Sequence, residues 1–131
     1  MSNYVIGVDL GGTQIRSVLA TTKGEIVARD QRWTLADEGP EAVIARIIDS
    51  VEDVRNQSGI AGQAEESIGA IGIGAPGPTD PHRGVVLMGP NLPGWFQVNL
   101  RDELYKPFGV PVYIGNDANL AGLAELRFGA G

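Results

Sequence analysis

Three extended segments follow one another at the start of this chain without a helix between them, and this succession constrains the fold most. Residues 4–10 are mostly apolar and end at a glycine-rich turn, 11–13. Residues 15–21 resume with β-branched side chains, as the second strand of a hairpin does. After a Lys-Gly turn, residues 25–34 alternate well enough to form a third strand. The chain is therefore predicted to open with an antiparallel meander.

The apolar residues change to helical spacing after Pro40, and a helix is predicted to run from there to Ser58-Gly59. An apolar, glycine-rich strand is predicted at 67–75, and residues 79–97 are predicted to form a long irregular loop. The last predicted elements are a short helix at 100–108, a strand at 111–114 and a helix at 116–128. This order predicts an α/β fold with a mixed sheet, a three-strand antiparallel meander plus parallel strands, flanked by helices.

The composition argues against nucleic-acid binding, membrane insertion and thiolate metal sites. The 131 residues suit one compact domain, and a formal net charge of −6 without a basic stripe argues against nucleic acid as a partner. No apolar run reaches the roughly 20 residues that span a bilayer, and the start lacks the features of a signal peptide, so no membrane partner and a cytoplasmic location are expected. The absence of cysteine excludes thiolate metal sites within the chain. Because the net charge is negative, a phosphorylated ligand would need a metal ion or backbone N–H groups to offset the repulsion.

The first candidate site is the segment from Asp9 to Thr13. An acidic residue at a strand end, followed by two glycines and a threonine, makes a tight turn whose N–H groups can face phosphate oxygens. The Thr13 hydroxyl would lie beside them, and Asp9 would hold magnesium through water. Asp and Gly are also ordinary hairpin residues, so the segment alone fits both interpretations. A dinucleotide fingerprint is excluded because its glycine spacing is absent, and a Walker A loop because no Gly-Lys-Ser/Thr follows.

The second candidate is Asn116-Asp117, at the predicted boundary between a strand and a helix. Both residue types cap helices well. A helix N-terminus also favours the carboxylate form, so an ionised Asp117 can act as a general base for a sugar hydroxyl that attacks a phosphoryl group. The capping role and the catalytic role are compatible.

Two loops complete the candidate set. Residues 75–77 close a strand with small residues, which either lets a ligand approach the backbone or forms a simple proline turn. Asn91 lies in a Pro-Asn-Leu-Pro-Gly-Trp segment, and its amide can both donate to and accept from sugar hydroxyls. The same segment fits a surface loop pinned by a buried Trp95. The only histidine, His82, is assigned no role.

The order Asp-x-Gly-Gly-Thr, Gly-x-Gly-x-Pro-Gly, Asn-Leu-Pro-Gly-Trp and Asn-Asp-Ala-Asn resembles the ROK family (repressors, open reading frames, sugar kinases), most closely its glucokinase-like members. The resemblance covers essentially the whole chain. It implies the actin-like ATPase fold of the hexokinase superfamily, with a ribonuclease-H-like core. It also implies transfer of the γ-phosphoryl group of ATP, with Mg2+, to the 6-hydroxyl of a hexose.

The resemblance also implies roles for individual residues. Asp117 matches the catalytic base, and Asp9 is the expected magnesium position. The phosphate-binding positions are Asp9, Gly11, Gly12 and Thr13, and the sugar-binding positions are Asn91, Asn116, Asp117, Ala75, Pro76 and Gly77.

Two departures from the family pattern affect these expectations. Gln14 stands where many relatives carry lysine, which puts a phosphate contact from this position in question. Family members also continue into a second domain with a second phosphate loop, an adenosine pocket and usually a zinc site. We therefore expect residues 1–131 to be the N-terminal domain of a longer kinase, inactive alone, with zinc confined to the missing C-terminal domain. The full-length protein is expected to be a homodimer.

Two other function classes are alternatives. The first is the sugar-sensing domain of a ROK-type transcriptional regulator. Such regulators carry a helix-turn-helix region before the first strand. That strand is expected to begin here at Tyr4, which leaves no room for such a region in this sequence, and the retained Asp117 also favours the kinase. The second is a stand-alone binding or assembly module of the same fold, against which the matches at Asn91 and Asn116 argue.

Overall fold

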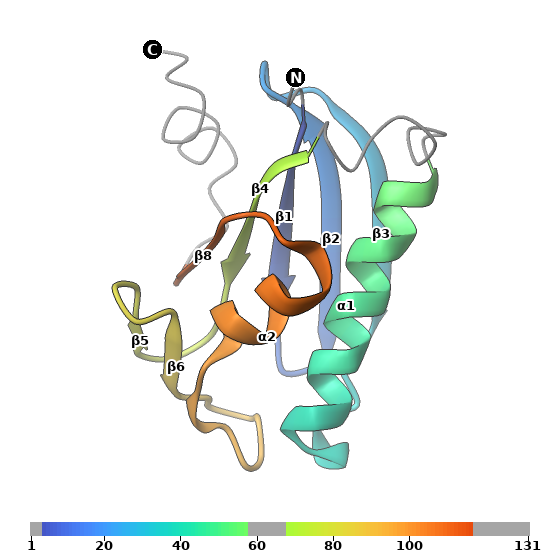
Figure 1. Ribbon diagram of the computed structural model, residues 1–131. Coiled ribbons are helices and arrows are strands. Elements are labelled where there is room, and N and C mark those ends of the chain that lie inside the picture. Colours follow the sequence, from blue (N-terminus) through green and yellow to red (C-terminus); the bar gives the residue numbers. More distant parts are fainter. Residues whose placement is uncertain (1–3, 58–67, 117–131) are drawn as a thin grey trace.

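The computed structural model describes residues 4–57 and 68–116, and Figure 1 shows them as a mixed sheet with helices against one face. The main sheet has five strands in the order β3-β2-β1-β4-β8. Neighbours among the first three are antiparallel, while β4 runs parallel to both β1 and β8. These strands are β1 (Tyr4–Leu10), β2 (Gln14–Thr21), β3 (Ile26–Trp33), β4 (Ile68–Gly74) and β8 (Val112–Gly115). The predicted meander plus parallel strands is confirmed.

Two α-helices cover the same face of this sheet, α1 (Pro40–Gln57) and α2 (Leu100–Phe108). Helix α1 packs on β2 and β3, and α2 packs on β8. Asn99 caps α2 by accepting a hydrogen bond from the third residue after it, as N-cap asparagines do. In the described part of the chain, neither helix is long and apolar enough to cross a membrane. The helix predicted at 116–128 lies outside the described residues apart from Asn116 and stays a prediction.

The core lies between the sheet and α1. Ile47 and Val51, at helical spacing on α1, are fully buried in one cluster with Ile6 of β1 and Leu19 of β2. Burying each such side chain stabilises the fold by about 1.5–3 kcal/mol relative to leaving it exposed. The burial also specifies strand register, because a slip of one residue would turn the apolar face of a strand to solvent.

The region 79–97, predicted to be an irregular loop, contains a second small sheet, so this prediction is wrong. Its strands pair antiparallel in the order β5-β6-β7 and are β5 (Thr79–Asp80), β6 (Val85–Met88) and β7 (Phe96–Val98). Its strands have two to four residues and are separated by prolines and glycines, which are typical of irregular loops. Figure 1 shows this sheet beside the ends of β4 and β8.

A polar network joins α1 to the edge strand β3. The Ser50 hydroxyl donates to the Asp30 carboxylate at 2.7 Å and is hydrogen-bonded to the Ser17 hydroxyl at 2.7 Å. The Arg32 guanidinium donates to the same carboxylate at 2.7 Å. Burial opposes ionisation of Asp30, but the hydrogen bonds from Arg32 and Ser50 outweigh it, so the pKa of Asp30 lies below its ordinary value of 3.8. The ionised form of Asp30 therefore stabilises the folded chain.

We expect Asp30→Asn to lower the free energy of unfolding at pH 7 by about 1–2 kcal/mol, because it removes charge-assisted hydrogen bonds. Since the folded-state pKa is lower than the unfolded one, this stabilisation is present above pH 3.8 and is lost as the pH falls through the folded value. The difference between wild type and variant should therefore shrink in acid. Thermal unfolding followed from pH 7 to pH 2 measures this, with the exposed Asp37→Asn as the matched control. A difference that stayed constant across that range would contradict the linkage.

Candidate functional site

Three chain segments meet at one edge of the sheet because β1, β4 and β8 run parallel. Asp9 in β1 is level with Gly74 in β4, and Gly74 is level with Gly115 in β8. The residues after each strand therefore emerge side by side, at the edge where open parallel sheets bind ligands. The segments that emerge there are the turn 11–13, the loop 75–77 and Asn116.

The turn after β1 is a hairpin turn with an open hollow beside it. The Gly11 N–H donates to the Gln14 carbonyl oxygen at 2.9 Å, which confirms the hairpin interpretation. Asp9 and Thr13 are exposed. The turn therefore offers a carboxylate, a hydroxyl and glycine backbone from one side, the chemistry that a hydrated cation or a phosphate group needs. The hollow has a volume of about 290 Å³ and is bordered by Asp9, Gly11, Gly12, Thr13, Gln14 and Arg16.

This turn contacts the loop 89–95 directly. A methyl group on Gly12 would lie 3.0 Å from the Cβ of Asn91 and 3.4 Å from its carbonyl oxygen. Only glycine lets the two backbones approach this closely without a shift. Asn91 is exposed and has a left-handed backbone (φ 61°), a conformation that asparagine tolerates better than most residues. The glycine turn and Asn91, predicted from separate motifs, are therefore neighbours in the fold.

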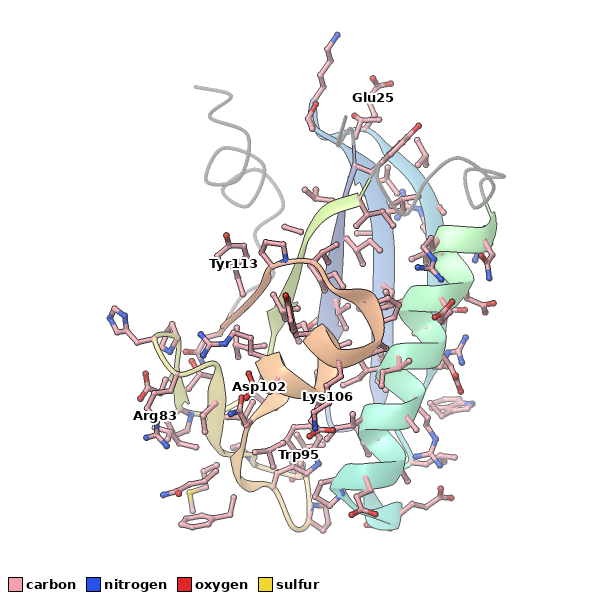
Figure 2. All side chains as sticks on the ribbon, in the orientation of Figure 1. Glu25, Arg83, Trp95, Asp102, Lys106 and Tyr113 are labelled. Carbon is pink, nitrogen blue, oxygen red and sulfur yellow. The ribbon has the colours of Figure 1, made fainter. Side chains whose placement is uncertain are left out.

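Buried side chains hold the loop that carries Asn91. Leu92 and Trp95 are each 3% exposed, and Figure 2 shows Trp95 turned inward between this loop and the lower end of α1. The loop also closes on itself, because the Gly89 N–H donates to the Trp95 carbonyl at 3.2 Å and the Leu92 N–H to the Gly89 carbonyl at 3.0 Å. The expectation of a loop pinned by Trp95 is confirmed. The pinned loop presents Asn91 to solvent next to Gly12.

Asn116 uses its side-chain amide to hold the loop after β4. Its Nδ2 donates to the carbonyl oxygens of Ala75, at 3.4 Å, and of Gly77. Its Oδ1 accepts a hydrogen bond from the Thr79 hydroxyl at 3.3 Å. Thr79 was not among the residues predicted from the sequence. Pro76, between the two carbonyls, is half-buried. The candidate residues 75–77 and Asn116 therefore form one hydrogen-bonded unit.

Asp117, the predicted general base, lies outside the described residues. It follows Asn116 directly in the sequence, and its role stays a prediction.

Arg16 also borders the hollow, although sequence analysis did not single it out. It is level with Asp9 in the hairpin, and its Nη2 donates to the side-chain oxygen of Gln14 at 3.0 Å. The guanidinium is thus held beside the turn, where a cation favours an anionic ligand. The signal was present in the sequence, because a two-residue hairpin loop between Gly11 and Gln14 makes Asp9 and Arg16 cross-strand partners.

The donors at the turn fit a magnesium ion that is shared with a ligand. Within residues 4–57 and 68–116, no group of three His, Cys, Asp or Glu side chains gathers that would hold a metal ion alone. Asp9 is a single exposed carboxylate. Mg2+ commonly binds through one or two carboxylates and takes its other ligands from water and substrate phosphates. Asp9 therefore suits a magnesium ion that is bound partly by water and substrate phosphates, and not one that is enclosed by protein ligands alone.

Comparison with known proteins finds one family along nearly the whole chain. The sequence model of the ROK family matches residues 5–131. A glucokinase of Thermotoga maritima is 41% identical over 127 residues, which cover 97% of this chain and 38% of that protein. A xylose repressor of Caldicellulosiruptor bescii is 35% identical over 125 residues, which cover 95% of this chain and 30% of the repressor.

The fold matches solved structures of the same family. The crystal structure of a ROK family glucokinase from Streptomyces griseus in complex with glucose and AMPPNP superposes with a TM-score of 0.70 at 34% identity. The match covers 97% of this chain and 37% of that one. The predicted actin-like ATPase fold of these kinases is thereby confirmed, and the chain spans 30–38% of the length of these three relatives.

We expect the contact between Gly12 and Asn91 to appear as an energetic coupling. Gly12→Ala should cost about 1 kcal/mol of stability, because the new methyl group meets the Asn91 Cβ at 3.0 Å. Asn91→Gly removes that Cβ, so the cost of Gly12→Ala should be smaller in the Asn91→Gly background. Urea unfolding of the two single variants and the double variant gives the coupling energy. Equal costs in both backgrounds would show that the two loops are not in contact.

Proposed function

We propose that this chain, which belongs to the ROK family, forms the sugar-binding half of an ATP-dependent hexose kinase. The contact between Gly12 and Asn91 carries the proposal. It sets a turn suited to phosphate against an exposed amide suited to sugar hydroxyls. A phosphoryl-transfer enzyme needs its donor and acceptor sites in contact, because holding the reactants together supplies much of the rate enhancement.

The turn after β1 is the proposed donor side. Its glycine backbone and the Thr13 hydroxyl would bind phosphate oxygens of ATP, and Arg16 would add a positive charge beside them. Asp9 would hold a magnesium ion through water, and the bound ion would offset phosphate charge in a chain whose net charge is −6. Gln14 supplies no charge here and instead accepts a hydrogen bond from Arg16.

The loop 89–95 and the unit built by Asn116 form the proposed acceptor side. Asn91 would exchange hydrogen bonds with sugar hydroxyls through both ends of its amide. Because Asn116 is hydrogen-bonded to the carbonyls of Ala75 and Gly77, it would act on the sugar partly by holding Ala75, Pro76 and Gly77 beside it. The glucose and AMPPNP in the Streptomyces griseus glucokinase support this class of ligands.

Asp117 is the proposed general base. The 6-hydroxyl oxygen of the hexose attacks the γ-phosphorus of ATP, the bond from that phosphorus to the β–γ bridging oxygen breaks, and the hydroxyl proton passes to the Asp117 carboxylate. ADP and the hexose 6-phosphate are the products. Asp117 directly follows Asn116 in the sequence, and the contact of Asn116 with loop 75–77 supports this role.

The chain is the proposed N-terminal domain of a longer protein. It spans 38% of the Thermotoga maritima glucokinase, and its hollow beside Gly12 is open. The remaining nucleotide contacts and the zinc site would belong to further sequence, and the complete protein would be a homodimer.

The second candidate is a sugar-sensing domain of a transcriptional regulator, which the 35% identity to a xylose repressor favours. Asp117 argues for the kinase, because a sensor needs no general base. The two candidates differ in turnover, since a sensor would bind a sugar without phosphorylating it.

We expect the full-length gene product to phosphorylate glucose with MgATP, and Asp117→Ala to lower kcat about 100-fold or more, the usual contribution of a general base. A coupled assay for ADP measures both. Glu25→Gln, on an exposed turn between β2 and β3 at the other end of the sheet (Figure 2), is the matched control and should keep full activity.

Near wild-type turnover in the Asp117→Ala variant would leave Asp117 as a helix cap only. Sugar binding without turnover in the wild type would favour the regulator. The 131-residue chain, assayed beside the full-length protein, should show no turnover, and robust activity from it would contradict the assignment of half a site.

We expect Asn91→Ala to raise the KM for glucose about tenfold, the equivalent of one lost hydrogen bond, with the KM for ATP within twofold of wild type. Asn56→Ala, on the exposed surface of α1, is the matched asparagine control. Steady-state kinetics with each substrate varied in turn separate the two effects. Equal increases in both KM values would remove Asn91 from the sugar side.

A further inference from the structure

Thr34 holds the turn after β1 from its inner side. It follows β3, is 0% exposed and does not border the hollow. Its hydroxyl donates to the Gly11 carbonyl oxygen at 2.7 Å, and its N–H donates to the Thr13 carbonyl oxygen at 2.8 Å. One buried residue thus binds the carbonyls on both sides of Gly12.

These two hydrogen bonds orient the peptide groups of the turn. In a planar trans peptide the C=O and N–H of one unit point in opposite directions. When Thr34 draws the Gly11 carbonyl inward, the N–H of Gly12 must point away from Thr34. Because Thr34 is on the buried side and the hollow is on the open side, this N–H is directed outward, where a phosphate oxygen can accept from it.

Thr34 is itself held by α1. The Arg46 guanidinium donates from Nη1 to the Thr34 carbonyl at 2.8 Å and to the Leu35 carbonyl at 3.3 Å, and it forms an ion pair with Glu38. Leu35 has a left-handed backbone (φ 51°), so the chain turns sharply directly after Thr34 into the short 3-10 helix η1 (Ala36–Glu38). The hydroxyl, N–H and carbonyl of Thr34 are therefore all hydrogen-bonded, and helix α1 sets where they lie.

We propose that Thr34 is a positioning residue for nucleotide binding, which orients the Gly12 N–H toward the phosphates of ATP through the Gly11 carbonyl. The proposal rests on the proposed function, because it takes the turn as the phosphate site. The proposal assigns Thr34 to the ATP-binding side of the site only, and not to the sugar-binding side. Among the described residues, Thr34 makes no hydrogen bond to the sugar-side residues, and the turn lies between Thr34 and Asn91.

A purely structural role for Thr34 predicts a different outcome. Loss of any buried hydroxyl lowers stability, and a general loosening would weaken both substrates. Ser50 supplies the matched control, because its hydroxyl is also fully buried and hydrogen-bonded to β3, at Asp30, but does not touch the turn. Ser50→Ala should therefore lower the melting temperature without a selective effect on ATP.

The test compares Thr34→Val, which removes the hydroxyl at nearly constant volume, with Thr34→Ser, which retains it, in the full-length gene product. Thr34→Val should raise the KM for ATP, and the Kd for MgATP measured by calorimetry, about tenfold, with the KM for glucose within twofold. Thr34→Ser should restore at least half of the lost affinity. The amide proton resonance of Gly12 should shift in Thr34→Val and stay near its wild-type position in Thr34→Ser.

The outcomes separate the two proposals. If the wild type binds MgATP but phosphorylates no hexose, the proposed function fails, and the calorimetric comparison still decides the role of Thr34. If Thr34→Val binds MgATP like wild type, weakens both substrates equally, or behaves like Ser50→Ala, the positioning role is wrong. A wild type that binds no MgATP would overturn both proposals.

Discussion

The parallel pairing of β4 with β1 on one side and β8 on the other is the constraint on which the candidate site depends. It puts Asp9, Gly74 and Gly115 in one row, so that three loops from distant parts of the sequence begin at the same level. The buried cluster beneath α1 and α2 fixes this register, because a slip would expose apolar side chains. The buried core therefore sets where the loops of the candidate site begin, and the loops add the polar groups.

The small sheet β5-β6-β7 brings the asparagine loop to this edge. Its strands are short, but the loop between β6 and β7 is held by two nearly fully buried side chains, Leu92 and Trp95. The burial of these two side chains holds Asn91 in its close contact with Gly12. Asn91 is thereby presented on a loop that the core holds in place, which suits its proposed role in distinguishing one arrangement of sugar hydroxyls from another.

Strands β1 to β4 of the main sheet were predictable because each has seven or eight residues and shows its pattern, and because β-branched residues follow the Gly11-Gly12 turn. The small sheet was not, since its strands have two to four residues and lie in a segment interrupted by prolines and glycines, whereas the four-residue β8 is an uninterrupted apolar run and was predicted. The candidate residues on loops were predictable as motifs, and the resemblance to one family joined them. The hydrogen bonds of Asn116 to the loop after β4, and those of Thr34 to the turn after β1, were not predictable. Each depends on a contact between residues more than 20 positions apart, which no local pattern records.

Helix α1 links the packing of the sheet to the geometry of the turn after β1, the proposed phosphate site. Strand β3 lies at an edge of the described sheet and has a strand neighbour on one side only, so its position depends on what α1 contributes. The helix reaches it at two points, through Ser50 to Asp30 within the strand and through Arg46 to the backbone directly after it. The second point fixes Thr34 and, through Thr34, the carbonyls of Gly11 and Thr13. The orientation of the turn is thus specified from the helix across an edge strand, and not by the hairpin alone.

A hairpin turn of two residues with a glycine has several accessible backbone conformations. The hydrogen bonds of Thr34 favour one of them, and in the proposed phosphate site this is the conformation that directs the Gly12 N–H outward.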